Sequence, residues 1–197
     1  SLVADGLLWL TANFGLLAAI TVAPLWPFVQ MFGMHVPILT ALLPAQMEIG
    51  YDMIVYPALI ATTFTYMGLF LAYALRAKGT KKKSLGWSCF TTMTLANISE
   101  PGLYGIVLSD YKALIYTMIG NMCGALTCYL LRAKVYIFAG VGFPFLNSLR
   151  FGEDIIQGTI GCIVALAVAF TLGIIFGFQG EGKLQIGKKK LQISKKE

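Results

Sequence analysis

The most informative stretch of the sequence is Asn97-Ile98-Ser99-Glu100-Pro101-Gly102-Leu103-Tyr104-Gly105. It places a carboxylate, followed at once by a proline, inside an otherwise uncharged apolar segment that runs from Ser84 to Ser109. A lone carboxylate is costly to bury in hydrocarbon, so an ionisable residue at such a position indicates a functional site. Proline breaks a helix and glycine permits turns, so we expect an irregular backbone with Glu100 at its tip. The alternative is an acid at a helix end, at the water interface.

The composition of the chain is that of an integral membrane protein. Of its 197 residues, 57% are hydrophobic and only 12% are charged, whereas soluble domains carry about 25% charged residues. The apolar segments are long and continuous rather than alternating, which predicts helices and not a β-barrel. The net charge of +6 comes from lysines beside apolar segments, so membrane topology explains it and we expect no nucleic-acid partner.

The first uncharged run, Gly6 to Met47, is too long for a single crossing, because a bilayer needs only about 20 residues. Prolines and a glycine punctuate its second half, so we predict a crossing over Leu7 to Gln30 and then a broken re-entrant piece over Met31 to Gly50. The only histidine of the chain, His35, lies in that piece. A lone histidine among apolar residues is more often structural than a ligand, and the residues alone leave both interpretations open.

Three further segments are uncharged and long enough to span a bilayer: Met53 to Leu75, Ala113 to Leu131 and Ile155 to Phe178. Two lysine-rich regions, 76–83 and 183–197, are cytoplasmic by the positive-inside rule. The number of crossings between them must be even, and the last two spans already supply two. The segment from Ser84 to Ser109 must therefore enter and leave on the cytoplasmic side, and Arg132 to Asp154 must lie outside.

The piece over Met31 to Gly50 would then enter from the outer face, so two hairpins would carry His35 and Glu100 toward the same depth. Transporters build midplane sites from discontinuous helices in this way. The predicted fold class is an all-α integral membrane protein with transmembrane helices plus two re-entrant hairpins from opposite faces. The four cysteines lie in apolar segments without metal-ligand spacing, and we expect no disulfide, metal or other cofactor.

The motif resembles the G-I-T-E-P-A-I-Y-G signature of enzyme IIC of the bacterial phosphoenolpyruvate-dependent sugar phosphotransferase system. The resemblance is to the glucose–glucoside superfamily, especially its β-glucoside, sucrose and trehalose branch. Further pieces match in the family's order, and the likeness extends to about Phe178: Phe32-Gly33-Met34-His35, Ile49-Gly50-Tyr51-Asp52, the loop over Lys78 to Ser84, and Lys134-Val135-Tyr136-Ile137-Phe138. Val36 stands where the β-glucoside branch has Trp, and Met47-Glu48 replaces more neutral residues, so the sugar is left open.

This resemblance implies a sugar permease that moves its substrate by a rigid-body elevator motion, after which enzyme IIB transfers a phosphoryl group to a sugar hydroxyl. Glu100 matches the hairpin glutamate that binds the sugar, and it would also orient the attacking hydroxyl as the catalytic residue. His35 matches the histidine of the first hairpin. Asn97, Ser99 and Glu48 complete the expected substrate-binding set.

The same resemblance assigns residues 1–180 to the C-terminal, sugar-holding half of an enzyme IIC domain and residues 181–197 to a basic, flexible cytoplasmic tail. The expected partners are a sugar, the enzyme IIB and enzyme IIA domains or proteins, the lipid bilayer and, in the full-length protein, a second copy. The expected location is the bacterial cytoplasmic membrane, crossed several times.

A different class of function stays open from the residues alone. The chain could be an unrelated ion-coupled transporter in which Glu100 carries a proton, or a non-catalytic membrane assembly protein. Ion-coupled uptake collapses with the proton gradient and delivers unmodified sugar. A phosphotransferase permease delivers sugar phosphate and requires phosphoenolpyruvate.

Overall fold

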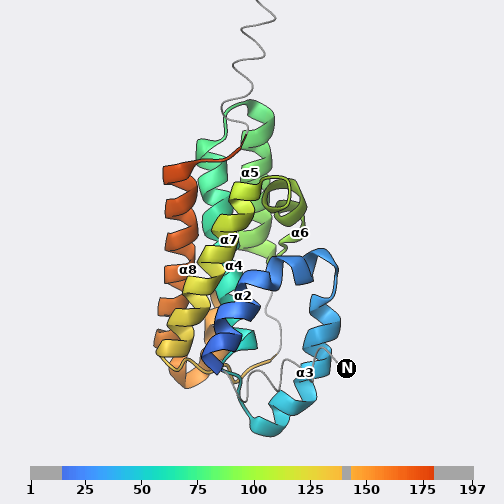
Figure 1. Ribbon diagram of the computed structural model, residues 1–197, viewed down its shortest axis with the longest axis vertical. Helices are drawn as coiled ribbons and strands as arrows, with labels where there is room; N and C mark the ends of the chain where they lie inside the picture. The colour runs from blue at the N-terminus through green and yellow to red at the C-terminus, as the bar shows by residue number, and fades with distance from the viewer. Residues whose placement is uncertain (1–14, 139–142, 180–197) are drawn as a thin grey trace, which may run out of the picture.

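Three long helices, α4 (Val55–Arg76), α7 (Tyr111–Leu130) and α8 (Ile155–Phe176), form the centre of the computed structural model (Figure 1). The structure describes residues 15–138 and 143–179. All three helices are long and apolar enough to cross a membrane, which confirms that the three segments expected from the sequence are apolar helices of spanning length. They pack closely through small residues: a Cβ placed on Gly124 of α7 would lie 2.6 Å from the Cβ of Ala165 on α8.

One end of this bundle is defined by polar contacts with the last turn of α8. Arg76, the last residue of α4, donates a hydrogen bond to the carbonyl of Ile174. The ammonium of Lys112, at the start of α7, donates to the carbonyl of Phe176 at 3.4 Å. The end of α4, the start of α7 and the end of α8 therefore lie together, at what we call the Arg76 end.

The opposite end is held by a short backbone pairing. Asp52, just before α4, and Val135, just after α7, exchange two hydrogen bonds of 2.9 and 2.8 Å. The carboxylate of Asp154, at the start of α8, accepts a hydrogen bond of 3.1 Å from the backbone N–H of Lys134. We call this the Asp52 end. The region 132–154, expected on one face of the membrane, contributes to it.

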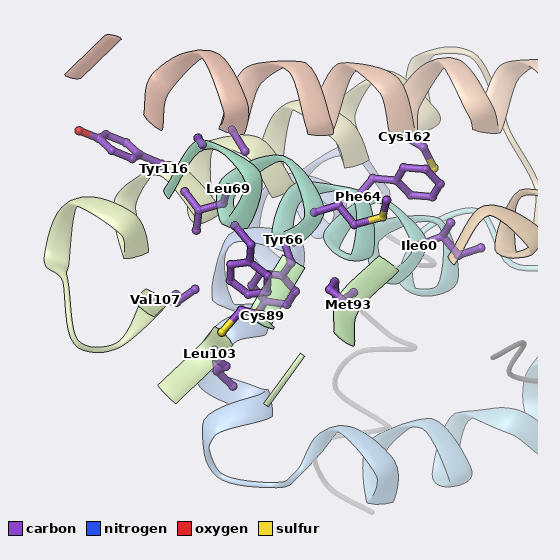
Figure 2. Packing of buried hydrophobic residues seen from close by; sticks show 14 of the residues in the cluster. Ile60, Phe64, Tyr66, Leu69, Cys89, Met93, Leu103, Val107, Tyr116 and Cys162 are labelled. Carbon is purple, nitrogen blue, oxygen red and sulfur yellow. The ribbon is translucent and has the colours of Figure 1, made fainter. Parts of the chain in front are cut away.

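The segment between α4 and α7 leaves the Arg76 end and returns to it. It runs as α5 (Thr80–Ala96), a break over 97–99, α6 (Glu100–Gly102) and the π-helix η1 (Leu103–Val107). Apolar residues of α5 and η1 join the main core cluster against α4, and Figure 2 labels Tyr66, Leu69, Cys89, Met93, Leu103 and Val107 among its members. The Glu100 motif is thus held against the middle of the bundle.

The first two described helices, α2 (Gly15–Met31) and α3 (His35–Ile49), form a second hairpin from the opposite end. Ala18 and Ala19 of α2 pack with Ile54 at the Asp52 end. The other end of α2 reaches only the middle of the bundle, where the Gln30 side chain accepts a 2.6 Å hydrogen bond from the Tyr66 hydroxyl.

α2 ends at Met31, which agrees with the expected end of the crossing at Gln30, but this end reaches only the middle of the bundle. The chain turns halfway along the bundle at Phe32-Gly33-Met34, where Gly33 has φ +68°, a backbone conformation that glycine adopts readily. α3 then returns toward the Asp52 end, where Ile38 and Leu42 pack against Val55. The start of the predicted crossing lies outside the described residues, as does the predicted tail over 181–197.

The last described element before α8 is the 3₁₀ helix η2 (Pro144–Asp154), which contacts α4, α5 and α8. This helix lies within Arg132 to Asp154, the region that the sequence predicts to lie outside the membrane. Gly152 interrupts it with φ +54° and ψ −115°, and Asn147, Arg150 and Phe151 are buried. η2 therefore turns inward, toward the space between the two hairpins.

Candidate functional site

The break in front of Glu100 follows from the local sequence. Asn97 ends α5 in the left-handed conformation, with φ +56°, and its N–H bonds to the carbonyl of Met93 at 3.2 Å. Asparagine is among the few residues other than glycine that tolerate this conformation. Pro101 then lies in the first turn of α6, where its missing N–H costs no intrahelical bond. The irregular backbone is present, and Glu100 starts the helix that follows it.

A cavity of about 390 Å³ lies between the two hairpins, with α4 and η2 completing its wall. Four of the five residues expected to bind substrate line it: His35, Asn97, Ser99 and Glu100. The fifth, Glu48, is exposed near the end of α3 and does not line the cavity. The volume falls within the range of about 300–1,000 Å³ that is typical of small-molecule sites.

The expected residues differ in how freely they face solvent. Glu100 is exposed, His35 and Asn97 are half-buried, and Ser99 is only 7% exposed. The Nδ1 atom of His35 is buried and has no hydrogen-bond partner among the described residues. A buried polar atom without a partner costs roughly 1–3 kcal/mol, so the site holds an unmet hydrogen-bonding demand in this state.

Several cavity residues were not anticipated from the sequence: Trp26, Gln30, Asn147 and Arg150. Arg150 is fixed in place, since its Nε donates to the carbonyl of Ile137 at 2.9 Å and its guanidinium lies 5.0 Å from the centre of the Tyr56 ring. The sequence offered a signal for two of these residues, since Trp26 lies between two prolines and Arg150 is a charged residue shortly before a predicted span. Asn147 offered none, because its position depends on the inward turn of η2.

The two hairpins also touch directly. The hydroxyl of Tyr104, in the Glu100 motif, donates a hydrogen bond of 3.1 Å to the carbonyl of Met31, at the end of α2. The sequence predicted a hairpin within Met31 to Gly50, whereas the structure forms the single helix α3 there and the hairpin consists of α2 and α3. The contact joins this hairpin to the Glu100 motif next to the cavity.

The cavity wall combines apolar and aromatic surface with neutral hydrogen-bonding groups. Among the described residues, Glu100 and Arg150 are the only carboxylate and the only guanidinium or ammonium that line it. Carboxylate, imidazole, amide and hydroxyl groups can accept from and donate to hydroxyls. Such a wall suits an uncharged ligand with several hydroxyl groups.

Comparison with known proteins finds relatives of one kind. The chain is 27% identical over 183 residues to the "PTS system beta-glucoside-specific EIIBCA component" of Dickeya chrysanthemi. It is 27% identical over 168 residues to the "PTS system arbutin-, cellobiose-, and salicin-specific EIIBC component" of Escherichia coli. It is 23% identical over 188 residues to the "PTS system sucrose-specific EIIBC component" of Pasteurella multocida. The chain is a distant homologue of these phosphotransferase-system components.

The homology covers most of the chain but a minor part of each relative. The three matches include 89%, 84% and 94% of this chain, and 28%, 35% and 39% of the respective relatives. No family model matches the chain. No solved structure matches it either. The resemblance drawn from the Glu100 motif is therefore confirmed at the level of distant homology.

Proposed function

We propose that this chain is the sugar-holding part of an enzyme IIC permease of a phosphoenolpyruvate-dependent sugar phosphotransferase system. The observation that carries the proposal is the cavity in which Glu100, Asn97 and Ser99 from one hairpin meet His35 from the other. The substrate would be a glucoside or a disaccharide, as the names of the homologues suggest.

In this proposal Glu100 is both a sugar ligand and the catalytic residue. Its carboxylate would accept hydrogen bonds from sugar hydroxyls and orient the hydroxyl that attacks the phosphoryl group on enzyme IIB. Phosphoryl transfer asks a protein mainly for positioning and charge stabilisation, and the carboxylate would supply positioning of the attacking hydroxyl. His35, Asn97 and Ser99 would bind the remaining hydroxyls. Enzyme IIA would recharge enzyme IIB.

The proposed setting is the bacterial cytoplasmic membrane, with α4, α7 and α8 spanning it. The lysines over 78–83 would place the Arg76 end in the cytoplasm by the positive-inside rule. The α5–η1 segment would then be a re-entrant hairpin from the cytoplasmic side, and α2–α3 one from the outer side. Irregular backbone such as the break over 97–99 is tolerated at membrane depth when it lines a cavity.

The test is the substitution Glu100→Gln in the intact transporter, which keeps the size of the side chain and removes its charge. A hydrogen bond to a charged acceptor contributes roughly 1.5–3 kcal/mol, so sugar affinity should fall about ten- to a hundredfold. Phosphorylation should fall further than binding if the carboxylate also stabilises the transition state. The measurements are sugar binding and phosphoenolpyruvate-dependent sugar phosphorylation in membranes.

The matched control is Glu153→Gln, which removes an exposed carboxylate that does not line the cavity. It should leave both binding and phosphorylation unchanged. Wild-type behaviour of Glu100→Gln in both assays would contradict the site. Delivery of unmodified sugar by the parent transporter, driven by a proton gradient, would instead support an ion-coupled mechanism and overturn the proposed function.

A further inference from the structure

Two cavity residues outside the Glu100 motif carry buried polar atoms that lack a partner. The indole Nε1 of Trp26 and the amide Oδ1 of Asn147 make no hydrogen bond with any described residue. Each side chain is only 2% exposed, and both residues line the cavity. Most buried polar groups in proteins are hydrogen-bonded, so two unpartnered atoms in the wall of one cavity call for an explanation.

The two residues come from elements that the sequence motif does not include. Trp26 lies on α2 and Asn147 on η2, whereas Asn97, Ser99 and Glu100 lie between α5 and η1. Other polar residues in the wall are already engaged: Gln30 bonds to Tyr66, and the hydroxyl of Thr62 bonds to the carbonyl of its own helix at Ala58. Within the cavity wall, the buried polar atoms without a partner among the described residues belong to Trp26, Asn147 and the predicted ligand His35, and three others lie outside the wall, on Gln46, Thr94 and Asn121.

The chemistry of the two atoms restricts what can satisfy them. The indole N–H can only donate, and the amide oxygen can only accept. An anion would satisfy Trp26 and not Asn147, and a cation would do the reverse. A hydroxyl group both donates and accepts, so one ring with several hydroxyls satisfies both.

We infer that Trp26 and Asn147 form a second polar subsite that binds hydroxyl groups of a neutral sugar. This inference rests on the proposed function and adds residues that set which sugar is accepted. The two residues line the cavity while the atoms themselves are buried, so a sugar would reach them after a rotation of each side chain. Glu100 would hold one part of the sugar, and Trp26 with Asn147 would recognise another.

The test begins with salicin, cellobiose and sucrose as probes, in membranes that contain the intact transporter. Phosphorylation of one of these sugars by the parent protein establishes the proposed function and selects the probe. Phosphorylation of none of them would count against the proposed function and against the subsite that depends on it.

The informative variants are Trp26→Phe, which removes the N–H and keeps an aromatic ring, and Asn147→Leu, which replaces the amide by an apolar group of similar size. Each should weaken affinity for the selected probe about two- to tenfold, the loss expected for one neutral hydrogen bond. Asn147→Asp keeps an acceptor oxygen and should retain more affinity than Asn147→Leu. Trp87→Phe is the matched control, because Trp87 is 40% exposed on α5 and does not line the cavity.

A stability measurement separates binding from a structural role. Because Asn147 Oδ1 has no partner without sugar, Asn147→Leu should be at least as heat-stable as the parent in the absence of the probe, and should gain less stability when the probe is added. Lower stability without sugar, together with unchanged probe affinity, would make Asn147 structural and overturn the subsite. Parent-like affinity in both Trp26→Phe and Asn147→Leu, with phosphorylation intact, would overturn the subsite and leave the proposed function standing.

Discussion

His35 is the residue at which the structural and the functional interpretations separate most clearly. It begins α3, directly after the turn that ends α2, and its ring lines the cavity. A structural histidine would be expected to bond through its buried nitrogen to a neighbouring group. Nδ1 of His35 finds no such neighbour among the described residues, which favours a role toward a ligand.

We therefore predict that His35→Ala weakens sugar binding by about tenfold and leaves membrane insertion intact. The reason is the loss of one hydrogen bond to the sugar, worth roughly 0.5–1.5 kcal/mol, and of the surface of the ring. The measurements are sugar affinity and the amount of protein in the membrane. Thr40→Ala serves as the control for a nearby cavity residue, because its hydroxyl already bonds to the carbonyls of Val36 and Pro37. Unchanged affinity in His35→Ala would return this residue to the structural interpretation.

At the scale of elements, the Glu100 hairpin depends on a close approach to α4. A Cβ on Gly102 would overlap the ring of Phe70, which is fully buried and stacks on Tyr66 at 5.6 Å between ring centres. A Cβ on Gly105 would lie 3.4 Å from Leu85, an ordinary contact. Gly102 has helical dihedral angles, so space and not backbone strain requires glycine there.

The predicted result is that Gly102→Ala destabilises the protein by about 1–3 kcal/mol, the usual cost of overpacking, while Gly105→Ala has little effect. The family signature that the motif resembles has alanine at this place, so a smaller residue on α4 should accommodate the methyl group. The double variant with Gly102→Ala and Phe70→Leu should therefore be more stable than the sum of the two single changes in unfolding free energy predicts. Thermal unfolding in detergent is measured for the parent, the single variants Gly102→Ala, Gly105→Ala and Phe70→Leu, and the double variant. Equal stability of Gly102→Ala and Gly105→Ala would disprove the close approach.

The helices could be predicted from the sequence better than the tertiary contacts between them. Uncharged length alone located α4, α7 and α8, and proline with glycine located the break before Glu100 and the turn after α2. The end of α2 at Met31 agrees with the predicted end of the crossing at Gln30, whereas the predicted start at Leu7 lies outside the described residues. Asn147 was missed because it reaches the cavity only through the tertiary contacts of η2 with α4 and α5, which are distant in the chain. Contacts between elements that are distant in the chain leave no periodic pattern in the sequence.

At the scale of the whole molecule, the two ends of the bundle should face opposite sides of the membrane. The Arg76 end carries the lysines over 78–83, and the Asp52 end carries η2. Arg150 would be a natural probe of the second end, but it is only 7% exposed and its guanidinium is bonded to Ile137. Glu153 is exposed on the same element and is a better probe. Lys188, in the lysine-rich region 183–197, would be a second probe of the cytoplasmic side, but it lies outside the described residues.

We predict that a cysteine placed at Lys81 is labelled only from the cytoplasm and one placed at Glu153 only from outside. The physical reason is the cost of moving a cluster of lysines across the membrane, which fixes the orientation of the helices. A membrane-impermeant maleimide, applied to intact cells and then to inverted vesicles, makes the measurement. The parent chain is the control: three of its four cysteines are buried and the fourth, Cys123, is half-buried, so it should label weakly from either side.

Labelling of both sites from one side would place both ends of the bundle on the same face, and labelling of Lys81→Cys from outside would invert the orientation. The first result would remove the basis for two hairpins that enter from opposite faces and meet at Glu100 and His35. The second would keep the two ends on opposite faces and overturn the cytoplasmic assignment of the Arg76 end.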